Sequence, residues 1–137
     1  MAQSTSLKSK AYMVEKTVTL GVASGTTVGP AVPANTMVIS AGIEFVTAAG
    51  SAGTSATVAV GDGVTANLAA VDMQAQAAGT ILGGVVPSFV SSADTIDAVL
   101  AVTGAGLVAA TARIWAVVVD VNENTKSADE VDRDTLA

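Results

Sequence analysis

Short runs rich in Val, Ile and Thr recur along the chain, separated by Gly, Pro, Asn and Asp. β-branched residues favour strands because they pack well on a pleated surface, whereas the separating residues favour turns. About eight such runs follow one another at close spacing, which is typical of antiparallel sheets packed face to face. The sequence therefore predicts an all-β fold, an antiparallel β-sandwich of the jelly-roll type.

The expected strands can be placed by the alternation of their residues and by the turns between them. Alternation predicts strands at 16–22, 37–47, 57–61, 81–90, 95–102 and 111–121. Gly61-Asp62-Gly63 predicts a hairpin whose second strand begins near Val64, because an Asp-Gly step between β-rich runs is a tight-turn signal. The Ala-rich residues 66–79 are compatible with either a short helix or an extended segment.

The faces of two strands can also be assigned. In the strand at 37–47, alternation predicts that Ile39 shares one face with Ile43 and Phe45. In the strand at 111–121, Trp115 shares one face with three valines and the other face is equally apolar. Such a strand is either central and covered on both faces, or meets another subunit on one face. We expect Trp115 to lie in the core or at a subunit interface, since a sugar-binding platform usually needs more aromatic partners.

The apolar residues are unusually small. The chain has 27 Ala and 22 Val but only one Trp, one Tyr and two Phe among its 137 residues. Aromatic rings bury the largest areas in most cores. A monomer built in this way lacks anchoring side chains, and burial between subunits would supply the difference. The composition therefore favours an oligomer.

Cysteine and histidine are both absent. Thiolate nucleophiles, disulfides, zinc sites built on Cys or His, and His-based acid–base catalysis are thereby excluded. Asp94 and Asp97 are three residues apart, so on a strand they point to opposite faces and do not form a catalytic pair. Asp94 is instead expected to begin a strand by bonding to backbone. We expect no enzyme activity, no metal site and no cofactor.

A glycine-rich motif lies between the last two expected strands. Residues 104–109 read GAGLVA, which matches the G-x-G-x-x-A form of the dinucleotide-binding fingerprint. That fingerprint requires a helix directly after the glycines, whose N-terminal N–H groups bind the pyrophosphate. Here a strand follows instead, so we interpret the motif as a hairpin loop.

Charge divides the chain into three parts. Residues 1–16 carry a net charge of +2, residues 17–121 carry −5 and residues 122–137 carry −3. We therefore expect an N-terminal arm at 1–16, a β-sandwich domain at 17–121 and an acidic C-terminal tail at 122–137. With six basic residues against twelve acidic ones, a nucleic-acid partner is not expected. No apolar run is long enough to span a membrane, and the N-terminus lacks a secretory signal, so no membrane partner is expected.

Three segments carry a resemblance to a known group of proteins. They are Val32-Pro33 before a strand, the loop ending in TVAVGDG at 57–63, and ADTIDAVLAVTGAGLVAATARIWAVVVDV at 93–121. In these segments the chain resembles small virion structural proteins of tailed bacteriophages, most closely the capsid decoration or cement proteins. The resemblance implies a β-sandwich that forms homotrimers and has no catalytic residues.

The resemblance also implies a function. The expected role is a non-enzymatic virion protein that binds the outer capsid surface and stabilises the head by bridging neighbouring capsid subunits. Its partners would be the major capsid protein and further copies of itself, its location the capsid surface, and its place of assembly the host cytoplasm. The alternative is a tail or fibre module that binds a host receptor or glycan, against which the low aromatic content argues.

The expected contact residues lie mainly in the arm, which combines basic and apolar side chains suited to an acidic, partly apolar surface. Together with Trp115, the candidate capsid- or subunit-interface residues are Leu7, Lys8, Lys10, Tyr12, Met13 and Lys16.

Overall fold

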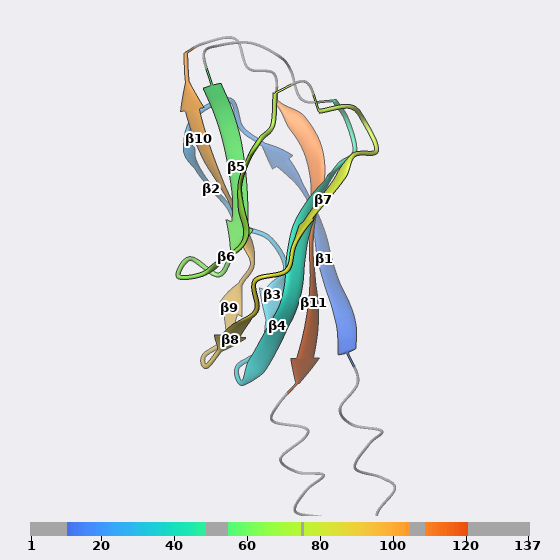
Figure 1. Ribbon diagram of the computed structural model, residues 1–137, viewed down its shortest axis with the longest axis vertical. Coiled ribbons are helices and arrows are strands. Elements are labelled where there is room, and N and C mark those ends of the chain that lie inside the picture. The colour runs from blue at the N-terminus through green and yellow to red at the C-terminus, as the bar shows by residue number, and fades with distance from the viewer. Residues whose placement is uncertain (1–10, 49–54, 75, 105–108, 121–137) are drawn as a thin grey trace, which may run out of the picture.

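The computed structural model describes residues 11–48, 55–74, 76–104 and 109–120, and every regular element in those ranges is a β-strand. Nothing in the described ranges is a helix long and apolar enough to cross a membrane. The strands form two facing layers (Figure 1). The chain is thus an antiparallel β-sandwich, as the residue pattern predicts.

The larger sheet has the strand order β1-β11-β4-β7, with β8 also paired to β4. Its strands are β1 (Ala11–Leu20), β11 (Ala110–Asp120), β4 (Thr36–Phe45), β7 (Ile81–Gly84) and β8 (Ser88–Val90). The smaller sheet has the order β2-β10-β5-β6, made of β2 (Gly25–Thr27), β10 (Asp97–Thr103), β5 (Ser55–Gly61) and β6 (Ala66–Asp72). A third, two-stranded sheet joins β3 (Ala31–Val32) to β9 (Asp94–Thr95).

The pairing order identifies the jelly roll. The first four strands pair in turn with the last four, β1 with β11, β2 with β10, β3 with β9 and β4 with β8, and every pair is antiparallel. The chain is therefore one long hairpin whose far end is the β5–β6 hairpin. Rolling that hairpin brings β4 beside β11 and β5 beside β10, which produces the two sheets. This topology confirms the jelly-roll prediction.

The core lies between the two layers and is built from alternate residues of each strand. In β11, Ile114, Ala116 and Val118 are fully buried, while Trp115 and Val117 on the other face are only partly buried. The largest fully buried side chains are Phe45, Leu20, Ile43, Met73, Ile96 and Ile114. Trp115 is not part of this core, because it lies on the opposite face of β11 and is only partly buried.

The first strand begins earlier than expected. β1 starts at Ala11, five positions before the expected start at residue 16, and pairs with β11 over ten consecutive residues. Tyr12, Met13 and Lys16 therefore belong to a strand of the sandwich and not to a separate arm. The charge count does not detect this boundary, because the side chains of β1 are largely exposed and can be polar.

A β-bulge reverses the expected inward and outward faces at the start of β4. The register between β4 and β11 shifts between Val117 and Val118, opposite the stretch that contains Ile39. Because the bulge adds one residue, the alternation reverses there: Val38 is fully buried and Ile39 is 41% exposed. Ile43 and Phe45, beyond the bulge, are buried as predicted.

The structure also decides three segments that the sequence left undecided or predicted wrongly. Residues 66–72 form β6 and not a helix, and the expected strand at 81–90 is divided into β7 and β8 by a segment containing Pro87, which has no N–H for a ladder. The hairpin expected at 104–109 is wrong, because β10 and β11 belong to different sheets. Residues 105–108 themselves lie outside the described ranges.

The hairpin at Gly61-Asp62-Gly63 is confirmed. β5 pairs antiparallel with β6, and Gly63 has a φ of 90°, which glycine adopts without strain. The Asp62 carboxylate accepts hydrogen bonds from the N–H groups of Val64 at 3.0 Å and Thr65 at 2.7 Å. The side chain thus stabilises the turn.

Candidate interaction surface

The carboxylates considered for chemistry bind backbone instead. Asp94 Oδ1 accepts the Thr95 N–H at 2.8 Å, as expected for a residue that begins a strand, and Asp97 Oδ1 accepts the Gly29 N–H at 3.2 Å. In the described ranges no three acidic side chains gather where they could hold a metal ion. These aspartates therefore serve local structure.

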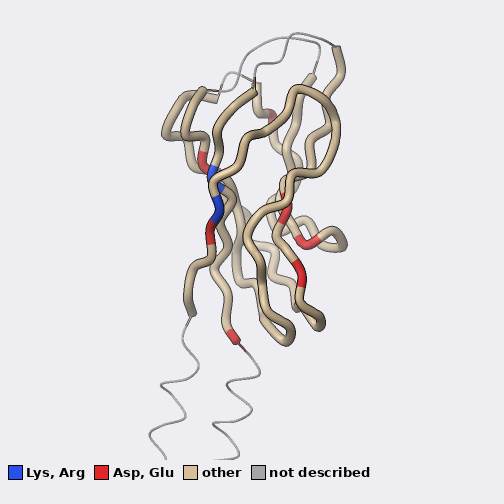
Figure 2. Tube along the Cα trace, turned by 180° about the vertical axis from the view of Figure 1, so that it is seen from behind, with Lys and Arg blue, Asp and Glu red and all other residues tan. Residues whose placement is uncertain are grey.

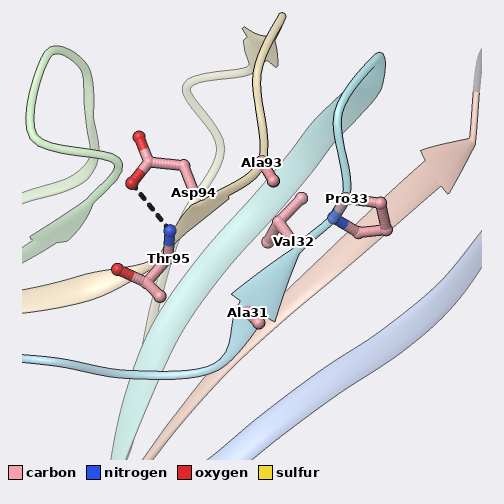
Figure 3. A pocket seen from close by; sticks show the side chains of 6 residues that line it. All are labelled: Ala31, Val32, Pro33, Ala93, Asp94 and Thr95. Atoms are coloured by element: carbon pink, nitrogen blue, oxygen red, sulfur yellow. Dashed lines mark hydrogen bonds between the residues drawn. The ribbon is translucent and has the colours of Figure 1, made fainter.

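A broad hollow beside β3 and β9 offers little chemistry. Its volume is about 600 Å³ and its lining is Ala31, Val32, Pro33, Ala93, Asp94 and Thr95. Figure 3 shows the one carboxylate turned toward the Thr95 N–H rather than toward Val32 and Pro33. The remaining lining is small and mostly apolar, with the Thr95 hydroxyl as its other polar side-chain group, so the hollow has few groups that could orient a polar ligand.

The outer face of the larger sheet, turned away from the core, has a more specific arrangement around Trp115. The register places Glu15, Trp115, Gly42 and Gly83 side by side across β1, β11, β4 and β7. A Cβ atom added at Gly42 would lie 2.6 Å from Cζ2 of the indole, and one added at Gly83 would lie 3.0 Å from it. The two glycines therefore leave space for the ring to rest on the backbone of β4 and β7.

Packing alone holds the indole ring in this position. Its Nε1 atom is buried and has no hydrogen-bond partner among the described residues. Beside the ring lies a shallow groove of about 270 Å³, which we name the Trp115 groove; it is lined by Met13, Glu15, Glu44, Ile81, Arg113, Trp115 and Val117.

The Trp115 groove is lined by two acidic residues and one basic residue. Nη1 of Arg113 donates a hydrogen bond to Oε1 of Glu44 at 2.7 Å, whereas Nε of Arg113 lies 4.0 Å from Oε2 of Glu15. The Glu15 side chain is 51% exposed. Two carboxylates face one guanidinium, so the groove has a net charge of −1. Figure 2 shows the basic positions of the described chain next to one another, with acidic positions beside them.

Large apolar side chains extend the outer face beyond the groove. Met13 is 58% exposed and Ile81 is 63% exposed at the groove itself. Farther along the sheet, Met37 pairs with Val119 on one side and with Phe89 on the other, and Phe89 is 52% exposed. Exposed apolar side chains on one face of a sheet are typical of protein interaction surfaces.

The structure separates the predicted site residues into three groups. Met13 and Trp115 meet in the Trp115 groove. Tyr12 and Lys16 lie on the same strand as Met13 but, by alternation, on the opposite face of the sheet. Leu7, Lys8 and Lys10 lie outside the described residues.

Sequence reasoning missed the remaining groove residues. Glu44 and Arg113 are 69 positions apart in the chain, so only the pairing of β4 with β11 reveals that they form an ion pair. Ile81 joins them through the pairing of β4 with β7. The one available signal was alternation, because Arg113, Trp115 and Val117 share a strand face.

The described chain is thus a single jelly roll whose distinctive feature is an exposed, partly apolar sheet face. No protein-family model matches it, and no curated protein does. Among solved structures, it resembles a chain from the capsid asymmetric unit of cyanophage Pam1, with a TM-score of 0.59 and 13% identity over 82% of this chain and 86% of that chain. It also resembles a chain from the acidic stable capsid structure of Helicobacter pylori bacteriophage KHP30, with a TM-score of 0.51 and 13% identity over 80% of this chain and 89% of that one. The chain therefore has a fold that occurs in phage capsids.

Proposed function

We propose that this chain is a non-enzymatic structural protein of a phage virion, which binds the outer capsid surface and stabilises the head by bridging neighbouring capsid subunits. The observation that carries the proposal is the match of the fold, over 82% of this chain, to a chain of a phage capsid. The turn and strand motifs that resemble capsid decoration proteins point to the same role.

The outer face of the larger sheet supports this proposal. It is broad and partly apolar, and its groove is shallow, which suits contact with another protein better than enclosure of a small molecule. Burying such a face across a junction would stabilise the bound shell over the unbound one by mass action. The partners in this proposal are the major capsid protein and further copies of the chain in a homotrimer.

A binding assay with undecorated heads tests the role. Purified protein is incubated with the heads, and the copies retained per particle are counted after purification. We expect saturable binding and a higher temperature of head disruption when the protein is bound. Absence of binding at micromolar concentration, or binding to host cells in place of heads, would overturn the proposal; the second result would favour a tail or fibre module.

Matched substitutions test which face makes the contact. Phe89→Glu places a charge on the outer face of the larger sheet, and Val99→Glu places one on β10 of the smaller sheet; the two side chains are 52% and 44% exposed. Neither should unfold the protein, because both side chains are exposed. We expect fewer copies per head for Phe89→Glu and unchanged occupancy for Val99→Glu. The reverse order would move the contact to the smaller sheet.

A further inference from the structure

The Trp115 groove is open among the described residues, and its chemistry fits one segment of the same sequence. We propose that it binds residues 7–10 of a second copy of the chain, so that neighbouring subunits exchange their N-terminal segments. This inference rests on the homotrimer in the proposed function and specifies how its subunits are joined.

The charges of the two partners are complementary. Arg113 is engaged by Glu44 at 2.7 Å and lies 4.0 Å from Glu15, so the half-exposed carboxylate of Glu15 is the less neutralised of the two and can attract a further cation. Residues 7–10 read Leu-Lys-Ser-Lys and carry two ammonium groups. An ammonium placed near Glu15 would neutralise the excess negative charge of the groove.

The apolar parts are complementary as well. The walls of the groove include Met13 and Ile81, both well exposed, and the Trp115 ring is part of the same lining. A lysine can lay its aliphatic stem on such a ring while its ammonium reaches a carboxylate. Leu7 would cover the apolar wall.

The geometry of β1 favours a second copy over the chain's own segment. Residues 7–10 precede Ala11, and Glu15 lies four positions farther along β1, roughly 13 Å at about 3.3 Å per residue. To turn back, the chain would use residues 9 and 10 in the tightest two-residue turn, which would leave Lys8 level with Ala11. The segment therefore cannot form its own reversal and also occupy its own groove. A neighbouring copy has no such constraint.

The exchange also suits a closed ring. Each copy offers one segment and one groove, and these are different surfaces, so the contact is heterologous. Heterologous contacts close into rings when the rotation permits, and a trimer is such a ring.

Tryptophan fluorescence gives a direct measurement at the groove. Trp115 is the only Trp in the chain, and residues 1–10 contain no aromatic residue. Acrylamide quenching is compared between the full chain and a variant without residues 1–10, which retains all of β1. We expect a quenching constant about two-fold larger in the truncated protein, because the partly buried ring loses its cover. Light scattering should show that truncation lowers the oligomeric state.

Adding the segment in trans tests the contact without altering the folded chain. A synthetic peptide of residues 1–10 is titrated into the truncated protein, and it should restore the protection of Trp115. A peptide with Lys8→Gln and Lys10→Gln should bind more weakly, with a larger difference at low salt than at high salt. Glu15→Gln in the protein should weaken binding too, whereas Asp94→Asn, which removes the same charge at β9 and keeps an oxygen to accept the Thr95 N–H, serves as the charge-matched control and should leave it unchanged.

Three results would overturn the inference. They are equal quenching in the full and truncated proteins, no response of the truncated protein to the peptide, and protection of the full chain that persists when dilution has made it monomeric. The head-binding assay is independent of all three. A protein that exchanges its segments but never binds heads would contradict the proposed function alone.

Discussion

The side chain of Trp115 rests on the backbone of two neighbouring strands, where Gly42 and Gly83 have no Cβ atoms to exclude it. Its other face is open to the groove, and its Nε1 atom is buried without a partner among the described residues. The ring therefore contributes contact area but no hydrogen bond. Its substitution should reflect packing alone.

We expect Trp115→Ala to lower the free energy of unfolding by about 2 kcal/mol, roughly half the cost of removing a fully buried aromatic ring. Trp115→Phe should change it by less than about 0.5 kcal/mol, because the smaller ring keeps most of the contact and removes an unpaired donor. Urea unfolding followed by circular dichroism measures both variants. A loss for Trp115→Phe equal to that for Trp115→Ala would show that the indole N–H has a partner that stabilises the fold.

At the scale of the elements, Asn67 joins the two sheets along one side of the sandwich. It lies on β6 with no exposed surface, and its Nδ2 donates hydrogen bonds to the carbonyl oxygen of Val86 at 2.8 Å and to Oγ of Ser88 at 3.0 Å. Val86 lies between β7 and β8, and Ser88 is the first residue of β8 in the larger sheet. This side chain therefore fixes the smaller sheet to the edge of the larger one.

Asn67→Ala should destabilise the protein by about 1–3 kcal/mol, because it removes both hydrogen bonds and leaves a small cavity. Ser88→Ala is the matched control, which removes one acceptor and should cost less than about 1 kcal/mol. Chemical denaturation of the two variants provides the comparison. An Asn67→Ala variant as stable as the parent would mean that the side-chain hydrogen bonds of Asn67 do not contribute to holding the two sheets together.

Another feature at this scale is the bulge between β4 and β11. It turns Ile39 outward and Val38 inward, so that an apolar residue joins the outer face while the core stays filled. The outer face thus gains part of its apolar character from a local irregularity.

At the scale of the whole molecule, many core residues are small while large apolar residues lie on the outer face. Alanines such as Ala41, Ala98, Ala112 and Ala116 are fully buried between the sheets, where larger residues would supply more burial per position. Large side chains such as Phe89 and Ile81 lie on the surface instead. This distribution favours a subunit that completes its burial against other chains.

We therefore expect the purified full-length protein to be a trimer at micromolar concentration, with a mass about three times the 13.4 kDa of one chain. Multi-angle light scattering coupled to size exclusion measures this directly. Phe89→Glu is an informative companion, because a charge on the outer face should lower the oligomeric state if that face also joins the subunits. A single species of 13.4 kDa for the unaltered chain would contradict self-assembly away from the particle.

Local features of the structure could be predicted from the sequence because their causes are local. The turn at Gly61-Asp62-Gly63 depends on an Asp side chain and a glycine φ within a few residues, and the buried face of β11 depends on alternation within one strand. The all-β class and the jelly-roll type follow from many such signals along the chain.

Only the tertiary structure decided which strands meet and in what register. The row of Glu15, Trp115, Gly42 and Gly83 is drawn from four strands, and the ion pair of Arg113 with Glu44 spans 69 positions. The bulge that turns the Ile39 side chain outward also depends on the partner strand. A residue of β4 is extra only in relation to the number of residues that β11 places opposite it. Alternation determines two faces for each strand, but which faces become neighbours depends on long-range pairing, and for this reason the Trp115 groove could not be assembled from the sequence.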